Sequence, residues 1–162
     1  MSARFGIGKA NATALVANTA KTVLSLATAP NHAIRITELG ISFDGIVNTD
    51  KPGLVCLVTL SADGTKTALS TAAQTDPTTA VGTIHKLDEA IADTLDTSGG
   101  YAYTVEPTIS KILGSWYVHP QTGIVLPAND LGMVIIPASS FVAVWAKFVA
   151  AVNLGVYLKF EE

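Results

Sequence analysis

Apolar and polar residues alternate most regularly near the end of the chain, between Val152 and Glu161. Apolar residues occupy the even positions there, and Asn, Gly, Tyr, Lys and Glu occupy the odd ones. Because successive side chains of a strand point to opposite faces, this pattern predicts a strand with one buried face. The preceding segment keeps the same parity, with one row of Val142, Val144, Ala146 and Phe148 and a second row of Phe141, Ala143, Trp145 and Lys147.

The two segments are expected to pair as a hairpin that turns around Ala150. Phe148 would then face Val152 in the buried row, and Trp145 would lie over Gly155 in the second row and shield its bare backbone. The turn contains no Gly, Asn or Asp to adopt a positive φ, which the favoured hairpin turns require. The pattern therefore predicts both strands, and their register depends on a turn of unfavourable composition.

Aromatic residues gather in the second row of this expected hairpin. Phe141 and Trp145 share the row, and the pairing adds Tyr157 to it. Aromatic side chains on the outer face of a sheet are typical of protein interfaces, and left uncovered they promote aggregation. We therefore expect these residues, together with Trp116 and Tyr117, to form an interface with another copy or another protein. The alternative is a sheet that is buried on both faces.

The rest of the chain contains short β patterns that recur at a spacing of roughly ten residues, a mark of antiparallel sandwiches and barrels. There is no strand–helix alternation, no glycine-rich nucleotide-binding motif and no internal repeat. The sequence thus predicts an all-β protein, an antiparallel β-sandwich or jelly roll of about eight to ten strands. Residues 12–162 would form one such domain. The further expected strands are residues 13–17, 21–28, 33–44, 54–61, 65–71, 101–105, 112–118, 123–126 and 132–136.

Three segments depart from regular strands. Residues 1–11 are rich in glycine and polar residues, which predicts a flexible N-terminal arm. Residues 72–100 lose the alternating pattern, and the spacing of Ile84, Leu87 and Ile91 suggests a short helical turn. We expect an irregular surface excursion there, since a long loop in a compact domain is often functional. The apolar parity switches at Glu38-Leu39-Gly40, which predicts a β-bulge.

Composition narrows the kinds of partner. Charged residues make up 14% of the chain, against about 25% in an average soluble domain, and such a surface favours an oligomer or attachment to a larger partner. The net charge is −3 and the basic residues are scattered, so neither a nucleic-acid groove nor an anionic membrane surface is expected as a partner. Cys56 is the one cysteine, which excludes an internal disulfide. A membrane-spanning helix over residues 141–158 is not expected, because Lys147 lies at its centre and the period is two.

Candidate chemistry is sparse, and no enzyme activity or cofactor is expected. The histidines lie in separate loops without metal-ligand spacing, so a cupin-like enzyme that uses His85 or His119 is an alternative of low weight. Trp116 and Tyr117 would form an aromatic platform for a sugar. The competing interpretation places one ring in the core and the other at an edge.

The order of several short segments carries a resemblance to a known family. These segments are Ser115-Trp116-Tyr117-Val118-His119-Pro120, then residues 123–126, then Ile135-Ile136-Pro137 and the ending Phe160-Glu161-Glu162. Together they resemble small structural proteins of tailed-phage virions, of the jelly-roll capsid decoration or cement type. The resemblance covers mainly residues 101–162, and residues 72–100 match no pattern of the family.

The resemblance implies a non-enzymatic protein made in the host cytoplasm and placed on the capsid surface of the virion. It implies a homo-oligomer, a trimer at junctions of the major capsid protein, that stabilises the phage head through buried interface area. A phage tail or baseplate component is the nearest alternative. A carbohydrate-binding jelly-roll adhesion module that uses Trp116 and Tyr117 is the alternative from a different class.

Overall fold

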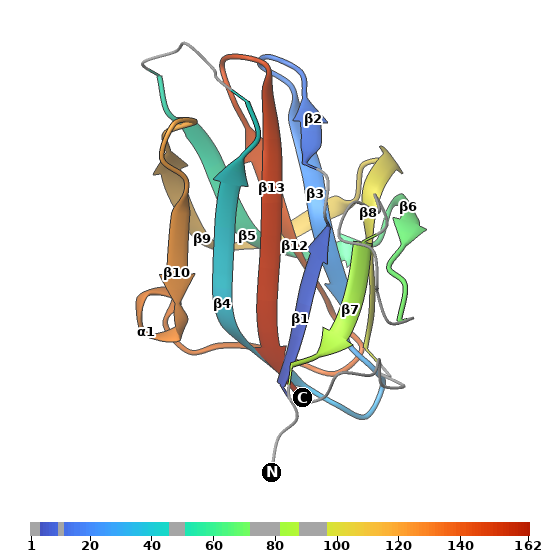
Figure 1. Ribbon diagram of the computed structural model, residues 1–162. Helices are drawn as coiled ribbons and strands as arrows, with labels where there is room; N and C mark the ends of the chain where they lie inside the picture. Colours follow the sequence, from blue (N-terminus) through green and yellow to red (C-terminus); the bar gives the residue numbers. More distant parts are fainter. Residues whose placement is uncertain (1–3, 10–11, 46–50, 72–81, 88–96) are drawn as a thin grey trace.

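The computed structural model describes residues 4–9, 12–45, 51–71, 82–87 and 97–162, and it shows two antiparallel β-sheets packed face to face (Figure 1). The described residues form thirteen strands and one four-residue helix, α1 (Ala128–Leu131). The prediction of an all-β antiparallel sandwich is confirmed. The expected strand number was too low, because residues 4–9 and 82–86 form strands within the segments expected to be an arm and an irregular excursion.

Sheet A contains seven strands, of which five follow the order β10-β4-β13-β1-β7. Strand β2 also pairs with β13, and β11 also pairs with β4. The bounds are β1 (Arg4–Lys9), β2 (Thr13–Leu15), β4 (Ile34–Phe43), β7 (Gly82–Lys86), β10 (Ile124–Pro127), β11 (Val134–Ile136) and β13 (Val152–Glu161).

Sheet B contains six strands in the order β6-β8-β3-β12-β5-β9. The apolar strand β5 lies between β12 and β9, and β9 is one edge of the sheet. The bounds are β3 (Ala20–Ala27), β5 (Gly53–Ala62), β6 (Thr65–Ala68), β8 (Ser98–Val105), β9 (Thr108–Val118) and β12 (Phe141–Lys147).

The predicted hairpin between the last two strands is wrong. Strand β12 pairs with β3 and β5 in sheet B, whereas β13 pairs with β4 and β1 in sheet A. Figure 1 shows β13 in the near sheet and β12 in the sheet behind it. The two strands pack against each other across the sandwich, so Trp145 does not cover Gly155. Their matching apolar rows arise because both rows face one core, an arrangement that produces the same period of two as a hairpin.

These two rows are part of the core between the sheets. Val142, Val144, Ala146 and Phe148 are buried, and so are Val152, Leu154, Val156, Leu158 and Phe160. Phe148 follows β12 at the crossing between the sheets, and its ring contacts Phe43 edge to face, with 5.4 Å between the ring centres. The same ring occupies the space where a side chain at Gly53 would lie, since a Cβ atom there would be 2.0 Å from it.

The N-terminal segment is not the flexible arm that was expected. Arg4–Lys9 forms β1, which pairs with β13 on one side and β7 on the other. Phe5 and Ile7 are buried, and the Phe5 ring stacks on Phe160 with 5.3 Å between ring centres. The sequence prediction gave too little weight to these two apolar residues, because glycines surround them. Burial of the two side chains against neighbouring strands favours a strand here.

The irregular excursion is only partly described. Gly82–Lys86 is strand β7 with Ile84 buried, and β8 begins at Ser98, so these parts are strands and not loop or helix. The expected helical turn includes Ile91, which lies outside the described residues. The predicted bulge in β4 is confirmed close to the expected position, because the register with β13 shifts between Ile36 and Glu38.

Candidate functional site

The outer face of sheet B is an apolar surface built from three neighbouring strands. Residues that are directly paired in antiparallel strands share one face. The pairings of β12, β5 and β9 therefore define four rows on the face that points away from the core. These rows are Lys147-Leu54-Tyr117, Trp145-Cys56-Ser115, Ala143-Val58-Ile112 and Phe141-Leu60-Ile109. We call these residues the sheet B outer face.

The sheet B outer face becomes more exposed toward the edge strand. Cys56, Val58 and Ala143 are buried beneath the partly buried rings of Phe141 and Trp145. On β9, by contrast, Tyr117 is 75% exposed, Ile112 58% and Ile109 38%. Lys147 is the single charged residue in the four rows. Cys56 is a buried free thiol, and burial raises its pKa.

The outer face of sheet A carries ion pairs on its central strands β4 and β13, and exposes Val125 and Ile135 on the neighbouring β10 and β11. The Tyr157 hydroxyl donates to Glu38 Oε1 over 2.6 Å, and Lys159 Nζ lies 2.8 Å from the same oxygen. Arg35 forms an ion pair with Glu161 at 2.7 Å. The hydrogen bonds from Lys159 and Tyr157 lower the pKa of Glu38. Burial is the larger cause, and the hydrogen bond to Glu38 the smaller one, of a Tyr157 pKa raised to about 12. The central strands of this face thus carry paired charges, whereas the four rows of the sheet B outer face contain one charged residue, Lys147.

The Glu38 pairing makes a testable contribution to stability. Because folding lowers the Glu38 pKa below its ordinary 4.5, the contribution is complete above that pH and disappears as the pH falls through the lowered value. We expect Glu38→Gln to cost less than about 1 kcal/mol of unfolding free energy at pH 7, as for other surface ion pairs. Urea denaturation should show this difference shrinking at acidic pH. A difference independent of pH would contradict the assignment.

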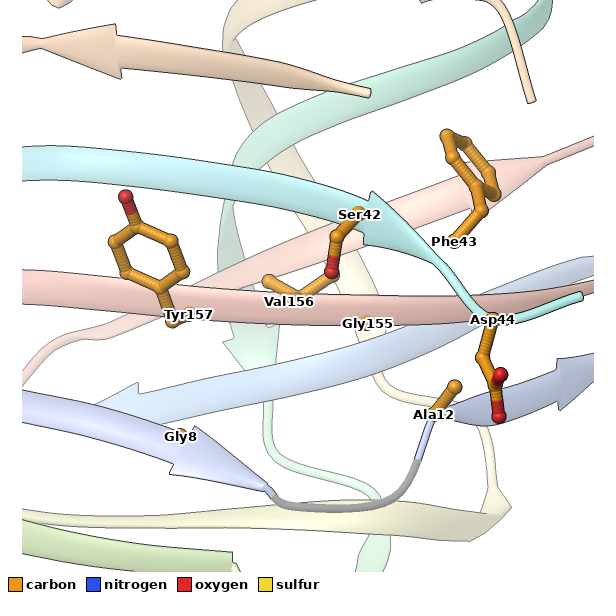
Figure 2. Close-up of a pocket in the computed structure, with 8 residues that line it drawn as sticks. All are labelled: Gly8, Ala12, Ser42, Phe43, Asp44, Gly155, Val156 and Tyr157. Atoms are coloured by element: carbon orange, nitrogen blue, oxygen red, sulfur yellow. The ribbon is translucent and has the colours of Figure 1, made fainter. Parts of the chain in front are cut away.

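A shallow trough lies on the outer face of sheet A, beside the polar network. Its volume is about 200 Å³, and it is lined by Gly8, Ala12, Ser42, Phe43, Asp44, Gly155, Val156 and Tyr157. Figure 2 shows Tyr157 at one end and Asp44 at the other, with Ser42 and Gly155 between them. The residues come from β1, β4 and β13 and from the segments that flank β2 and β4, which the sheet register brings side by side.

A buried polar cluster holds the edge of sheet B. The Tyr103 hydroxyl lies 2.5 Å from Ser25 Oγ and 3.0 Å from Asp63 Oδ1. Lys66 Nζ is 3.2 Å from Ser25 Oγ and forms an ion pair with Asp63. Ser25 is fully buried and Tyr103 is 4% exposed, and burial raises the Tyr103 pKa. A serine next to a lysine is a nucleophile–base pair in some enzymes, but a fully buried hydroxyl offers no access to a substrate.

The aromatic residues singled out in the sequence are divided among three surroundings. Phe141 and Trp145 share the sheet B outer face with Tyr117, as expected for the first two. Tyr157 belongs to the opposite sheet, because β12 and β13 do not pair. Trp116 packs against the core and lies over Gly114, while Tyr117 points the other way. The two neighbours therefore do not form one aromatic platform for a sugar.

Within the described ranges, no group of three or more His, Cys, Asp and Glu side chains is arranged to hold a metal ion. His119 lies in a turn after β9, where its Nδ1 accepts from the Gln121 backbone N–H at 3.3 Å. His85 falls in β7, and its side chain is outside the described residues. In the part of the chain that the structure describes, no helix is long and apolar enough to cross a membrane.

The fold and surfaces define the chain as an all-β antiparallel sandwich, apolar on the outer side of β12, β5 and β9 and ion-paired on the outer side of β4 and β13. A scan against protein-family models and a search of curated proteins find no match for it. Its function is therefore argued from these surfaces.

Proposed function

We propose that the protein is a non-enzymatic structural component that assembles with copies of itself through the sheet B outer face. The observation that carries the proposal is the contrast between the two outer faces. Sheet A presents ion-paired side chains, whereas the outer rows of sheet B place Phe141, Trp145 and Leu54 beside the exposed Tyr117 and Ile112. An apolar, aromatic-rich face of this kind is characteristic of protein interfaces.

The position of β9 supports self-association. This eleven-residue strand is an edge of sheet B and carries Ile109, Ile112 and Tyr117 with a single lysine, Lys111. Edge strands of monomeric proteins are commonly protected by charges or prolines, and an uncovered apolar edge invites another chain. If a second copy paired with this edge, the apolar surface of β12, β5 and β9 would extend across the contact onto the second copy.

The specific setting that we propose is the outer surface of a tailed-phage head. There the protein would act as a decoration or cement protein, most simply a trimer seated on the major capsid protein. The segments that resemble this family include β9, which contributes Tyr117 to the sheet B outer face, and β13. Repeated attachment to a shell makes individually modest contacts effective.

The first experiment compares charge substitutions on the two outer faces. Trp145→Glu and Tyr117→Glu place a carboxylate on the sheet B outer face, and Val125→Glu places one on sheet A at a residue that is 56% exposed. A central interface tryptophan contributes about 2 kcal/mol or more, so we expect Trp145→Glu to raise the dissociation constant of the oligomer about thirtyfold or more. Light scattering over a dilution series measures the change.

Tyr117→Glu controls for the possibility that Trp145→Glu weakens the oligomer by destabilising the fold, because the exposed Tyr117 side chain is not part of the core. Both sheet B variants should weaken the oligomer, and Val125→Glu should leave it unchanged. A wild-type protein that remains a monomer, or sheet B variants that assemble normally, would overturn the choice of face. Co-sedimentation with purified phage heads or with tails then separates the decoration role from that of a tail or baseplate component.

A further inference from the structure

We propose that the trough on the outer face of sheet A binds one ring of a neutral saccharide. The inference goes beyond the assembly role and does not depend on it, because the trough and the sheet B outer face lie on opposite sides of the sandwich. Four features carry it: an aromatic ring laid on the sheet, a floor without side chains, two polar groups at one end, and a charge pattern that disfavours ions.

The aromatic feature is Tyr157. A Cβ atom at Gly40 would lie 1.9 Å from a carbon of the Tyr157 ring, so the ring rests directly on the backbone of the neighbouring strand. The hydrogen bond from its hydroxyl to Glu38, 2.6 Å long, fixes its orientation. The face of an aromatic ring carries partial negative charge and attracts C–H groups with partial positive charge. The C–H face of a sugar ring has this character.

The floor of the trough consists of strand positions that lack large side chains. A Cβ atom at Gly8 would meet no other described atom within 4 Å, so the space directly above this glycine is open. Gly155 lies beneath Ser42 Oγ, 2.6 Å from the position that a Cβ atom would take. The volume of about 200 Å³ is below the range of roughly 300–1,000 Å³ for drug-sized ligands, and it suits a single sugar ring.

The polar end of the trough is formed by Ser42 and Asp44 (Figure 2). A serine hydroxyl both donates and accepts, and a carboxylate accepts strong hydrogen bonds from hydroxyl groups. These are the complements of vicinal sugar hydroxyls. Aromatic packing at one end and hydroxyl recognition at the other match the two kinds of surface that a saccharide ring presents.

The charges around the trough favour a neutral ligand. The Asp44 carboxylate repels anions such as acidic sugars. A cation held over the Tyr157 ring would meet the ammonium of Lys159, which already lies 5.6 Å from the ring centre. A neutral polyol ring avoids both penalties.

The test uses the full-length protein and saturation-transfer NMR with glucose, galactose, mannose and N-acetylglucosamine oligomers. N-acetylneuraminic acid and choline serve as anionic and cationic comparison probes. We expect at least one neutral sugar to bind in the millimolar range, with transfer to its C–H groups, and the charged probes to bind at least tenfold more weakly. Binding only of a charged probe, or of no sugar, would refute the proposal.

Gly8→Leu is the decisive variant, because a Cβ atom there has open space around it and the rest of a leucine side chain would extend into the trough that Gly8 lines. It should reduce sugar binding at least tenfold while thermal unfolding stays at or above the wild-type temperature. Tyr157→Ala should also abolish binding, and Tyr157→Phe, which keeps the ring, is the matched control that should retain most of it. Normal binding by Gly8→Leu would exclude the trough as the site. An unchanged oligomer in Gly8→Leu keeps this result separate from the assembly proposal.

Discussion

Replacing Phe148 by alanine is expected to lower the free energy of unfolding by about 3–5 kcal/mol, the range for truncating a buried phenylalanine. The side chain is 1% exposed and contacts Phe43 at the point where the chain crosses between the sheets. Val149→Ala is the matched control, because its neighbouring side chain is 45% exposed and should change stability by no more than about 0.5 kcal/mol. Urea denaturation followed by tryptophan fluorescence measures both.

A double mutant tests the specific contact behind this effect. Gly53→Ala alone places a methyl group against the Phe148 ring and should cost about 1–3 kcal/mol as overpacking. In the Phe148→Ala background the same substitution has room and should be neutral or stabilising, which gives a coupling energy of opposite sign to the single effects. Simple additivity of the two substitutions would show that Phe148 and Gly53 are not in contact.

The second large effect is expected at Tyr103. Tyr103→Phe removes the hydroxyl that bonds to Ser25 and to the Asp63 carboxylate, while Lys66 remains a partner of both. A hydrogen bond to a charged group contributes about 1.5–3 kcal/mol, so we expect the variant to lose about that amount. Tyr117→Phe makes the same chemical change at a residue that is 75% exposed and should leave stability unchanged. Equal effects of the two variants would show that the Tyr103 cluster contributes nothing.

The fold class followed from the sequence because a period of two is a local property of each strand. Residues 152–161 were placed correctly as a strand with its apolar row buried. Which strand pairs with it could not be predicted from the local pattern. A row that faces the core has the same pattern whether its neighbour lies beside it in one sheet or opposite it in the other, and the absence of Gly, Asn and Asp from residues 149–151 was the one sign against a hairpin.

The candidate sites differ in how far the sequence reveals them. Phe141 and Trp145 could be assigned to one outer face, because they alternate with a buried row in the same strand. The trough could not be found in this way. Gly8, Ser42 and Gly155 belong to three distant segments, and only the register of β1, β4 and β13 brings them together. A glycine or serine in a strand carries no signal of its own.

The separation of β12 and β13 also affects how the chain reaches its native state. Strand β12 fills the gap between β3 and β5, and β13 fills the gap between β4 and β1. Both sheets therefore stay divided until residues 141–161 have been synthesised and have inserted. Such non-local pairing slows folding, and in a nascent chain these four earlier strands would wait with unpaired edges that can join other chains. Productive folding therefore depends on the insertion of β12 and β13 before such encounters occur.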